Sequence, residues 1–345
     1  MKKTTTMFLA IVVVGLVLYA APSAVSFLSA SLTGFNFNGS VFYYSLDAGD
    51  SFLKNSQGLA FGEINNFIFA PDASIFNATN QGLFKTVQLG EKWERIVDET
   101  GFLRSPVAIN QMVFLDQNSS DILVAASKSN FGRLYRSADG LKSLKEVYST
   151  NNEGAVISDL KFNPQNNRIY FISTEGVFSC SDNGGASFRL LKQFSDSLQK
   201  IVFDPKNDQN IFIISSQSLY KSSDAGYSFA DLSGILAAYG ISGINDIWFS
   251  KENGLFLASN SGAWRSFDFG STWQKMDSLL PEGLPATAIM YNDERGEVLI
   301  GFGGRLYISP NGHDWSIRSL NQSNVIRAIK INPSDSNIIL VGMKR

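Results

Sequence analysis

Short runs of hydrophobic residues recur along most of this chain, and each run is interrupted by glycine, asparagine, aspartate or serine. One stretch shows the pattern clearly, with runs at Asn245–Phe249, Gly254–Ser259, Ala263–Ser266 and Thr272–Met276. Runs of this length, rich in β-branched and aromatic residues, are typical of β-strands and too short for most helices. The pattern therefore predicts short strands joined by tight turns, in groups of four.

Seven copies of one turn motif divide the chain into these groups. The fullest copy, residues 266–273, reads Ser-Phe-Asp-Phe-Gly-Ser-Thr-Trp. The copies start at positions 45, 86, 137, 180, 222, 266 and 309, so that their spacing is 41 to 51 residues. In this alignment Cys180 takes the place of a serine, and its copy carries one extra residue. A period of this length is typical of propellers and solenoids.

The aspartates of this motif are predicted to be structural. An Asp or Ser side chain can bond to backbone N–H groups two or three residues further on, and glycine adopts backbone angles that a Cβ would resist. Seven copies spread over the chain cannot converge on one ligand, so a metal or substrate site at each copy is disfavoured. The structural role is assigned to Asp47, Asp139, Asp182, Asp224 and Asp268.

The two ends of the repeat region complement each other. After the last motif the chain supplies two strands, Val325–Ile331 and Asn337–Met343, and before the first motif it supplies only Val41–Ser45. We expect Val41–Phe52 to pair beside Asn337–Met343, because a shared blade leaves no exposed strand edge. The predicted fold is all-β: residues 31–345 form a seven-bladed β-propeller of four-stranded antiparallel blades, closed by N-terminal strands that complete the C-terminal blade.

The motif resembles the Asp-box, or bacterial neuraminidase repeat, from about Phe42 to the end of the sequence. Families with this repeat include sialidases, xyloglucan-cleaving glycosidases, sortilin-type receptors and the photosystem II assembly factor of plastids and cyanobacteria. The resemblance implies a propeller in which the motif joins the third and fourth strands of a blade, away from the ligand face. In length, single ring and export signal the chain looks like the assembly factor, at the level of the repeat only.

Residues 1–30 are predicted to be a signal peptide or an N-terminal membrane anchor. Basic residues at Lys2 and Lys3 precede an apolar run from Met7 to Ala21, and no charged residue follows before Asp47. Fifteen apolar residues suit a signal peptide, while the apolar character that resumes up to Ala30 allows an uncleaved anchor spanning residues 7–30. Both alternatives predict an extracytoplasmic propeller that is periplasmic, secreted or at the cell surface, because the basic residues stay inside.

Composition narrows the chemistry further. Charged residues make up 17% of the chain and its net charge is −2, which gives no electrostatic footprint for nucleic acid. The single Cys cannot form an intramolecular disulfide, and one Cys and one His cannot form a common zinc site, so no metal or other cofactor is expected. A Ser-His-Asp triad would have to use His313 inside a degenerate turn motif, and this possibility is disfavoured.

Polar residues recur where the first strand of each repeat begins, which in propellers is the mouth of the central channel. They are amide-rich and mostly uncharged, and they are either water-satisfied or available to bond sugar hydroxyls or a peptide backbone. The binding candidates among them are Asn65, Asn110, Asp159, Gln199, Lys200, Asn245, Asp246 and Arg327.

These candidates favour binding over catalysis. Glycoside hydrolysis needs two carboxylates across the substrate, and Asp159 and Asp246 are the best pair by repeat position. The arginine cluster that sialidases need is missing from the matched positions, where only Arg327 is an arginine. The sequence therefore predicts a non-catalytic binding or scaffold propeller for a protein partner or a surface polymer. The alternative is a glycoside hydrolase or carbohydrate-binding propeller of the sialidase or xyloglucanase type.

Three loops between repeats carry apolar residues, and two interpretations of them stay open. The loops are Glu94–Val107, Leu232–Ser242 and Gln274–Ala286. Their apolar side chains either form a patch for a partner or fold down as caps over the blade ends.

Overall fold

The structure is a computed structural model, and it describes residues 41–54, 63–89, 92–252, 254–276, 279–321 and 323–344. Contacts divide the chain into two units, Met1–Asn38 and Gly39–Arg345. The predicted leader, residues 1–30, lies outside the described residues. None of the described helices has the length and apolar character needed to cross a membrane.

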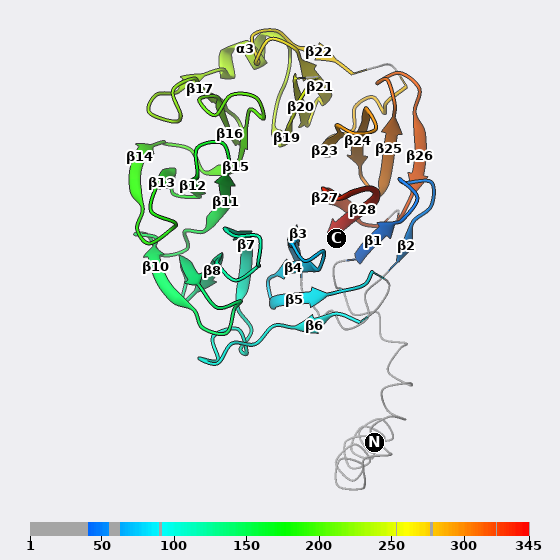
Figure 1. Cartoon of the computed structure of the whole chain (residues 1–345). Coiled ribbons are helices and arrows are strands. Elements are labelled where there is room, and N and C mark those ends of the chain that lie inside the picture. The colour runs from blue at the N-terminus through cyan, green and yellow to red at the C-terminus, as the bar shows by residue number, and fades with distance from the viewer. Residues whose placement is uncertain are drawn as a thin grey trace, which may run out of the picture. The chain divides into compact units, whose positions relative to one another are not determined.

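Residues from Val41 onward form seven four-stranded antiparallel sheets in a ring, which confirms the predicted seven-bladed β-propeller (Figure 1). Six sheets take four consecutive strands each. Blade I has β3 (Ile64–Phe69), β4 (Ile75–Thr79), β5 (Gly82–Thr86) and β6 (Glu94–Arg95); blade II has β7 (Ala108–Phe114), β8 (Ile122–Lys128), β9 (Phe131–Ser137) and β10 (Lys145–Ser149). Blade III has β11 (Ile157–Asn163), β12 (Arg168–Ser173), β13 (Val177–Ser181) and β14 (Arg189–Gln193); blade IV has β15 (Leu198–Phe203), β16 (Ile211–Ser215), β17 (Leu219–Ser222) and β18 (Ala230–Asp231).

Blade V has β19 (Ile244–Ser250), β20 (Gly254–Ser259), β21 (Gly262–Ser266) and β22 (Gln274–Lys275); blade VI has β23 (Ala286–Asn292), β24 (Glu297–Phe302), β25 (Arg305–Ser309) and β26 (Ser316–Ser319). Blade VII has β27 (Val325–Asn332), β28 (Asp335–Lys344), β1 (Val41–Ser45) and β2 (Leu53–Lys54). One short helix, α3 (Ser233–Ala238), lies between blades IV and V.

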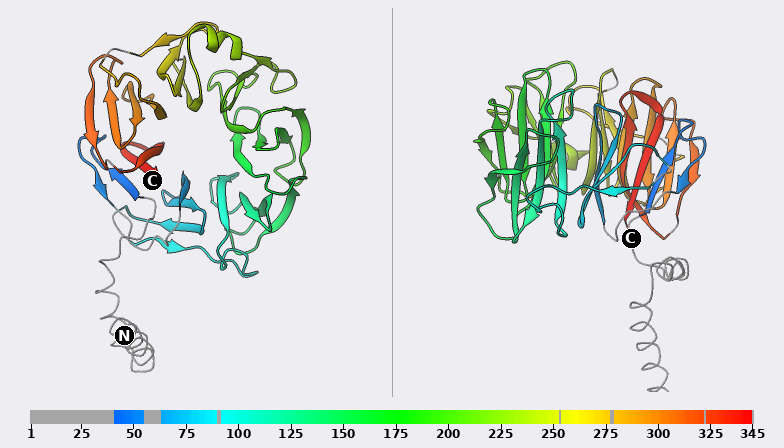
Figure 2. Two further views of the ribbon diagram at one scale, coloured as in Figure 1. Left: turned by 180° about the vertical axis from the view of Figure 1, so that it is seen from behind. Right: turned by 60° about the horizontal axis from the view of Figure 1, so that its bottom comes forward.

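Blade VII closes the ring with strands from both ends of the repeat region. The antiparallel register of β1 and β28 places Val41 opposite Met343 and Ser45 opposite Ile339. In two orientations of the ribbon, the blue β1 lies beside the red β28 (Figure 2). The predicted pairing is confirmed, and this closure removes the free strand edges that an open ring would expose.

The turns formed by the repeated motif join the third and fourth strands of the blades, and we call them the box turns. They share one pattern of hydrogen bonds. In the turn of blade VII, Ser45 Oγ donates to Asp47 Oδ1 at 2.7 Å and accepts from Gly49 N at 2.7 Å. Asp47 Oδ1 accepts from Ser51 N at 2.9 Å. Hydrogen bonds from Ser51, together with one from Ser45, lower the pKa of Asp47 to about 2. The carboxylate is thus ionised and used to hold its own turn.

The turns of blades II, IV and V repeat this pattern with Asp139, Asp224 and Asp268. In blade V, Thr272 N donates to Asp268 Oδ1 at 2.8 Å. The fifth position of the turn takes a positive φ, at +84° for Gly270 and +71° for the buried Leu141 that replaces glycine in blade II. The carboxylates of Asp139, Asp224 and Asp268 thus accept hydrogen bonds from residues of their own turns.

The prediction for the box turn of blade III is wrong by one residue. Ser181, and not Cys180, accepts from Gly185 N at 2.9 Å, and Asn183 Oδ1, and not Asp182, accepts from Ser187 N at 3.1 Å. Asp182 lies exposed beside the turn, with its Oδ2 3.8 Å from Arg189 Nε. The extra residue disappears in this register, and Cys180 becomes a fully buried residue of β13.

The core lies between adjacent blades, where the second and third strands are almost completely buried. Strands β4, β13 and β16 are buried along their whole length. Two of the three linker loops place a buried apolar side chain over the blade ends, Leu103 in one and Leu236 of α3 in the other, but each also leaves an apolar side chain exposed, Val97 and Tyr239. The third loop is mixed, because Leu280 is buried whereas Leu279 is 67% exposed.

Candidate functional site

A β-bulge interrupts the first strand of every blade at the same place. The register between first and second strands shifts at Ile64/Asn66, Ile109/Gln111, Ile157/Asp159, Leu198/Lys200, Ile244/Asp246, Ala286/Ala288 and Ile326/Ala328. The unpaired residue of each bulge is Asn65, Asn110, Ser158, Gln199, Asn245, Thr287 or Arg327. A bulge re-aims a side chain away from the regular pleat, so these seven residues can turn toward the channel.

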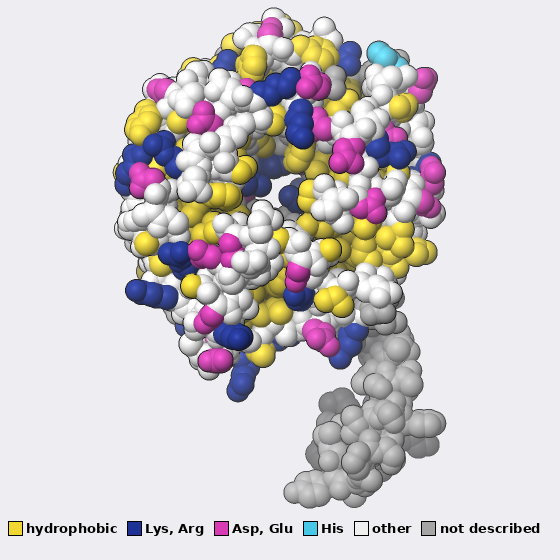
Figure 3. Space-filling view, viewed as in Figure 1, with side chains coloured by type: hydrophobic (Ala, Val, Ile, Leu, Met, Phe, Trp, Pro, Cys, Tyr) yellow, Lys and Arg dark blue, Asp and Glu magenta, His cyan; other side chains and the backbone are white. Residues whose placement is uncertain are grey.

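The bulges of blades I to V and of blade VII line one cavity of about 230 Å³ at the channel mouth. All eight predicted binding candidates line it, together with Lys161, Lys330 and several neighbours. The space-filling view shows the central opening, with basic side chains on its wall (Figure 3). The box turns lie at the other end of the blades: Ser266 pairs with Leu255 and Leu255 with Phe249, whereas the bulged Asn245 lies near the opposite end of the same strand.

The two carboxylates of the cavity hold neighbouring blades together. Asp159 Oδ1 accepts from Leu160 N and Oδ2 from Ile201 N of the next blade, both at 2.9 Å. Asp246 repeats the arrangement two blades further on, with Ile247 N at 2.9 Å and Ile289 N at 3.0 Å. Every carboxylate oxygen thus accepts a backbone hydrogen bond, whereas a general acid must carry a proton on an oxygen that faces its substrate.

Amides and a hydroxyl continue these links between blades. Asn65 Nδ2 donates to Ile109 O at 2.7 Å, and Asn245 Nδ2 donates to Ala286 O at 2.8 Å. Thr287 Oγ1 donates to the equivalent carbonyl, Ile326 O, at 2.7 Å. The side-chain amides of Asn65 and Asn245 therefore mainly hold neighbouring blades together at the channel mouth.

Three side chains of the cavity have no hydrogen bond or ion pair within the part of the chain that the structure describes. They are Gln199, Arg327 and Lys330, which come from blades IV and VII. Asn110 donates only one long bond, to Ser127 Oγ at 3.2 Å. These groups leave donors available inside the cavity, and donors are what carboxylates and carbonyls bind.

Lys330 has the most strongly altered acidity in the cavity. Its residue is half-buried and its ammonium group is enclosed by the channel wall. Burial, reinforced by the positive charges of Lys161 and Lys200, lowers the pKa of Lys330 to about 7. Lys161 Nζ lies 3.7 Å from Asp159 Oδ1, and Lys200 Nζ contacts Asp246 Oδ1, so both acidic partners are already used.

The candidates from sequence omitted Lys161 and Lys330. Both stand three residues after a bulge residue, at a position that is apolar in the other blades: Ile68, Val113, Val202, Trp248 and Met290. A lysine at a position that is otherwise apolar was the signal that would have identified them.

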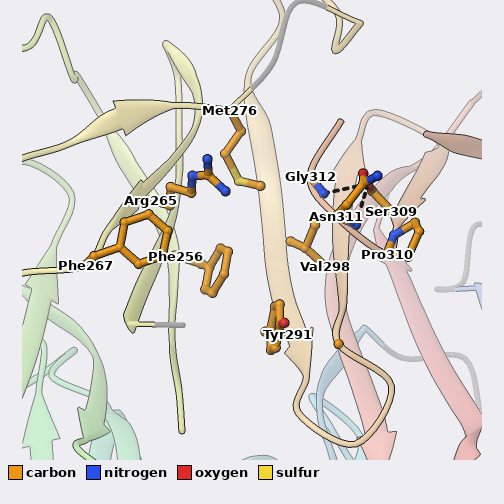
Figure 4. Close-up of a pocket in the computed structure, with 11 residues that line it drawn as sticks. Phe256, Arg265, Phe267, Met276, Tyr291, Val298, Ser309, Pro310, Asn311 and Gly312 are labelled. Atoms are coloured by element: carbon orange, nitrogen blue, oxygen red, sulfur yellow. Dashed lines mark hydrogen bonds between the residues drawn. The ribbon is translucent and has the colours of Figure 1, made fainter. Parts of the chain in front are cut away.

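A second, smaller cavity of about 120 Å³ lies between blades V and VI (Figure 4). The guanidinium of Arg265 lies 5.1 Å from the ring centre of Phe267, and Phe256 stacks on Tyr291 at 4.9 Å. The turn at Ser309, where Gly312 N donates to Ser309 Oγ at 2.8 Å, borders the other side. This cavity belongs to the box-turn region, and none of the described residues that line it is an Asp or Glu.

No group of three or more His, Cys, Asp or Glu residues suited to a metal ion occurs among the described residues.

Comparisons with known proteins agree on the fold. YCF48 from Cyanidioschyzon merolae is similar over 81% of this chain and 95% of its own, with a TM-score of 0.60 and 15% identity. A structure described as YCF48 bound to D1 peptide is similar over 90% of this chain and 96% of its own, with a TM-score of 0.63 and 14% identity.

The GH74 xyloglucanase from Xanthomonas campestris is similar over 88% of this chain, with a TM-score of 0.64 and 14% identity, and this chain spans 52% of its length. No protein-family model and no curated protein sequence matches the chain. At such low identities these similarities establish the propeller fold alone, so function has to be argued from the site.

Proposed function

We propose that this chain is a non-catalytic, extracytoplasmic binding protein that recognises a segment of a protein partner at the mouth of its channel. The observation that carries the proposal is the cavity lined by the bulges of six blades, in which Gln199, Arg327 and Lys330 keep their donors free of partners among the described residues. Convergent polar groups in a preformed cavity are typical of a ligand site.

Two further observations support binding rather than hydrolysis. Asp159 and Asp246 are the only carboxylates that line the cavity within the described residues, and each is held by backbone amides of two blades. A protein partner is favoured over a polysaccharide because a similar single ring, YCF48, is described with a bound D1 peptide, whereas the similar xyloglucanase is about twice as long. The basic residues and apolar run of residues 1–30 support export and, if the run is not cleaved, anchoring in the membrane.

The test is affinity capture from the membrane fraction of the host, with the full-length chain as bait. The variant Gln199→Ala/Arg327→Ala should lose the partner, because it removes two unpartnered donors from the cavity. The variant Gln88→Ala/Lys92→Ala removes one amide and one cation from the box turn of blade I and should retain it.

The purified full-length protein should release no product from xyloglucan oligosaccharides or sialosides. Turnover that disappears in Asp159→Asn or Asp246→Asn would show that the protein is a glycoside hydrolase. Equal capture by both double variants would place the binding face elsewhere.

A further inference from the structure

We propose that the channel-mouth cavity receives an Asp or Glu side chain of the polypeptide partner, and that Lys330 is the cation that binds its carboxylate. This inference rests on the proposed function, because it names the chemical class of the group that the binding face accepts.

The first argument is the charge balance of the cavity. Lys161 lies 3.7 Å from Asp159 and Lys200 contacts Asp246, so that two cations face two carboxylates. Lys330 faces the same four groups across the channel and forms an ion pair with none of them. Arg327 also lines the cavity without an ion pair among the described residues, so two positive charges of the cavity stay uncompensated, and Lys330 is the one enclosed by the channel wall.

The second argument is the cost of leaving this charge unpaired. The equivalent position carries an apolar residue in five other blades, and Ile329 and Ile214 also line the cavity. The ammonium group of Lys330 is enclosed by the channel wall, and an enclosed ammonium loses hydration that only an anion or several acceptors restore. The same loss of hydration lowers the pKa of Lys330 to about 7, because it disfavours the charged form. An arriving carboxylate removes this cost and therefore gains more affinity than it would at an exposed lysine.

The third argument is the ring of groups around the lysine. Asn110, Ser158 and Gln199 stand on three consecutive blades, at bulges that face the cavity. Amides and hydroxyls of this kind can bond the backbone on either side of an acidic residue. Arg327, exposed at the mouth, adds a second positive charge on the path inward.

Binding should depend on pH near neutrality. Lys330 gains a proton as the pH falls through about 7, and only the protonated form attracts a carboxylate. The four charged groups that face it, Lys161, Lys200, Asp159 and Asp246, include no histidine, and the only His of the sequence is His313 in the box turn of blade VI. Ligand carboxylates stay ionised between pH 6 and pH 8.

The experiment is calorimetric titration of the full-length protein with a ten-residue oligoglutamate and a matched oligoglutamine. At pH 6 we expect the acidic peptide to bind wild type at least about tenfold more tightly than the neutral one. Lys330→Met should weaken oligoglutamate binding by about the same factor. Lys206→Met is the matched control: Lys206 pairs with the exposed Glu252 and lies after the end of β15, away from the cavity, so its loss should leave binding unchanged.

A pH series gives a readout that a merely structural lysine would not produce. Oligoglutamate affinity for wild type should fall about tenfold between pH 6 and pH 8, as the protonated fraction of Lys330 falls. Lys330→Arg should hold its affinity over this range, because a guanidinium stays charged. Melting curves of each variant check that it is folded.

Three results would overturn the assignment: equal binding of both peptides by wild type, unchanged binding by Lys330→Met, or binding of oligogalacturonate without binding of oligoglutamate. If Lys330→Met captures the partner from membranes as wild type does while Gln199→Ala/Arg327→Ala does not, the carboxylate assignment fails and the binding face stands.

Discussion

Each blade carries polar side chains at both ends, and the two ends use them differently. At the box turns, Asp47, Asp224 and Asp268 bond to serine or threonine and backbone groups within seven residues of the same turn. At the bulges, Asp159 and Asp246 reach the backbone of the next blade. The box turns keep a Ser or Thr at the first position in every copy and an Asp or Asn at the third position in six of the seven, whereas the bulges keep their position and vary the residue. A residue that recurs in the repeats therefore indicates a role in stabilising its own turn. A position that recurs with varied residues indicates a surface that can recognise a specific ligand.

The largest expected effect tests the link between blades. Asp159→Ala removes the acceptor of Leu160 N and Ile201 N, both buried, and leaves Lys161 without its partner. We expect a loss of about 3 kcal/mol in the free energy of unfolding, measured by chemical denaturation. Asp159→Asn keeps one acceptor and should lose less. A loss as small as that of a box-turn variant would mean that the two ends of the blade do not differ in this way.

The second prediction concerns Lys330, at the bulge end of the blades, where a substitution should raise the free energy of unfolding instead of lowering it. Because the folded-state pKa of Lys330 is about 7, below its unfolded value, protonated Lys330 destabilises the fold. Lys330→Met should stabilise the unliganded protein at pH 6 by on the order of 2 kcal/mol.

The pH range of this gain follows from the same pKa values. The gain should be complete below pH 7 and should decline as pH rises from 7 toward about 10.4, where the unfolded chain also loses the proton. Thermal melting across this range measures it, and destabilisation at pH 6 would contradict the charge balance assigned to the cavity.

The smallest effects test the register of the box turn in blade III. Asn183→Ala removes the acceptor of Ser187 N and should lower the free energy of unfolding by about 1 kcal/mol. Asp182→Ala removes an exposed side chain that forms none of the hydrogen bonds described for the turn, and it should change the free energy of unfolding by less than about 0.5 kcal/mol. The reverse order would restore the alignment that begins at Cys180.

Much of the fold was predictable because the same short-range chemistry recurs. A Ser-x-Asp-x-Gly turn needs no distant partner, so its period gave seven blades, and the half-repeats at the two ends gave the closure. The register at residues 180–188 could not be read in the same way, because Cys-Ser-Asp-Asn-Gly-Gly offers two alignments. Only the bonds from Gly185 N to Ser181 and from Ser187 N to Asn183 distinguish them.

The candidate site was predictable in position and incomplete in chemistry. The mouth residues follow from counting back from the end of each first strand, and all eight of them line the cavity. Some of these residues form hydrogen bonds to a neighbouring blade, and which ones do so depends on contacts between residues more than 35 positions apart, such as Asn65 with Ile109. Lys330 needed the geometry of the ring as well, because its repulsion comes from Lys161 and Lys200 on other blades.

The shared blade VII has a consequence for the order of events during folding. Blades I to VI are each built from consecutive strands, so their hairpins can form while the rest of the chain is still being made. Blade VII must wait, because β1 pairs locally with β2 but meets its other neighbour, β28, almost the whole described chain later. Closing so long a loop costs entropy that no earlier local contact offsets. We therefore expect the docking of β1 on β28 to be the last event of folding, with one edge of each strand unpaired until then.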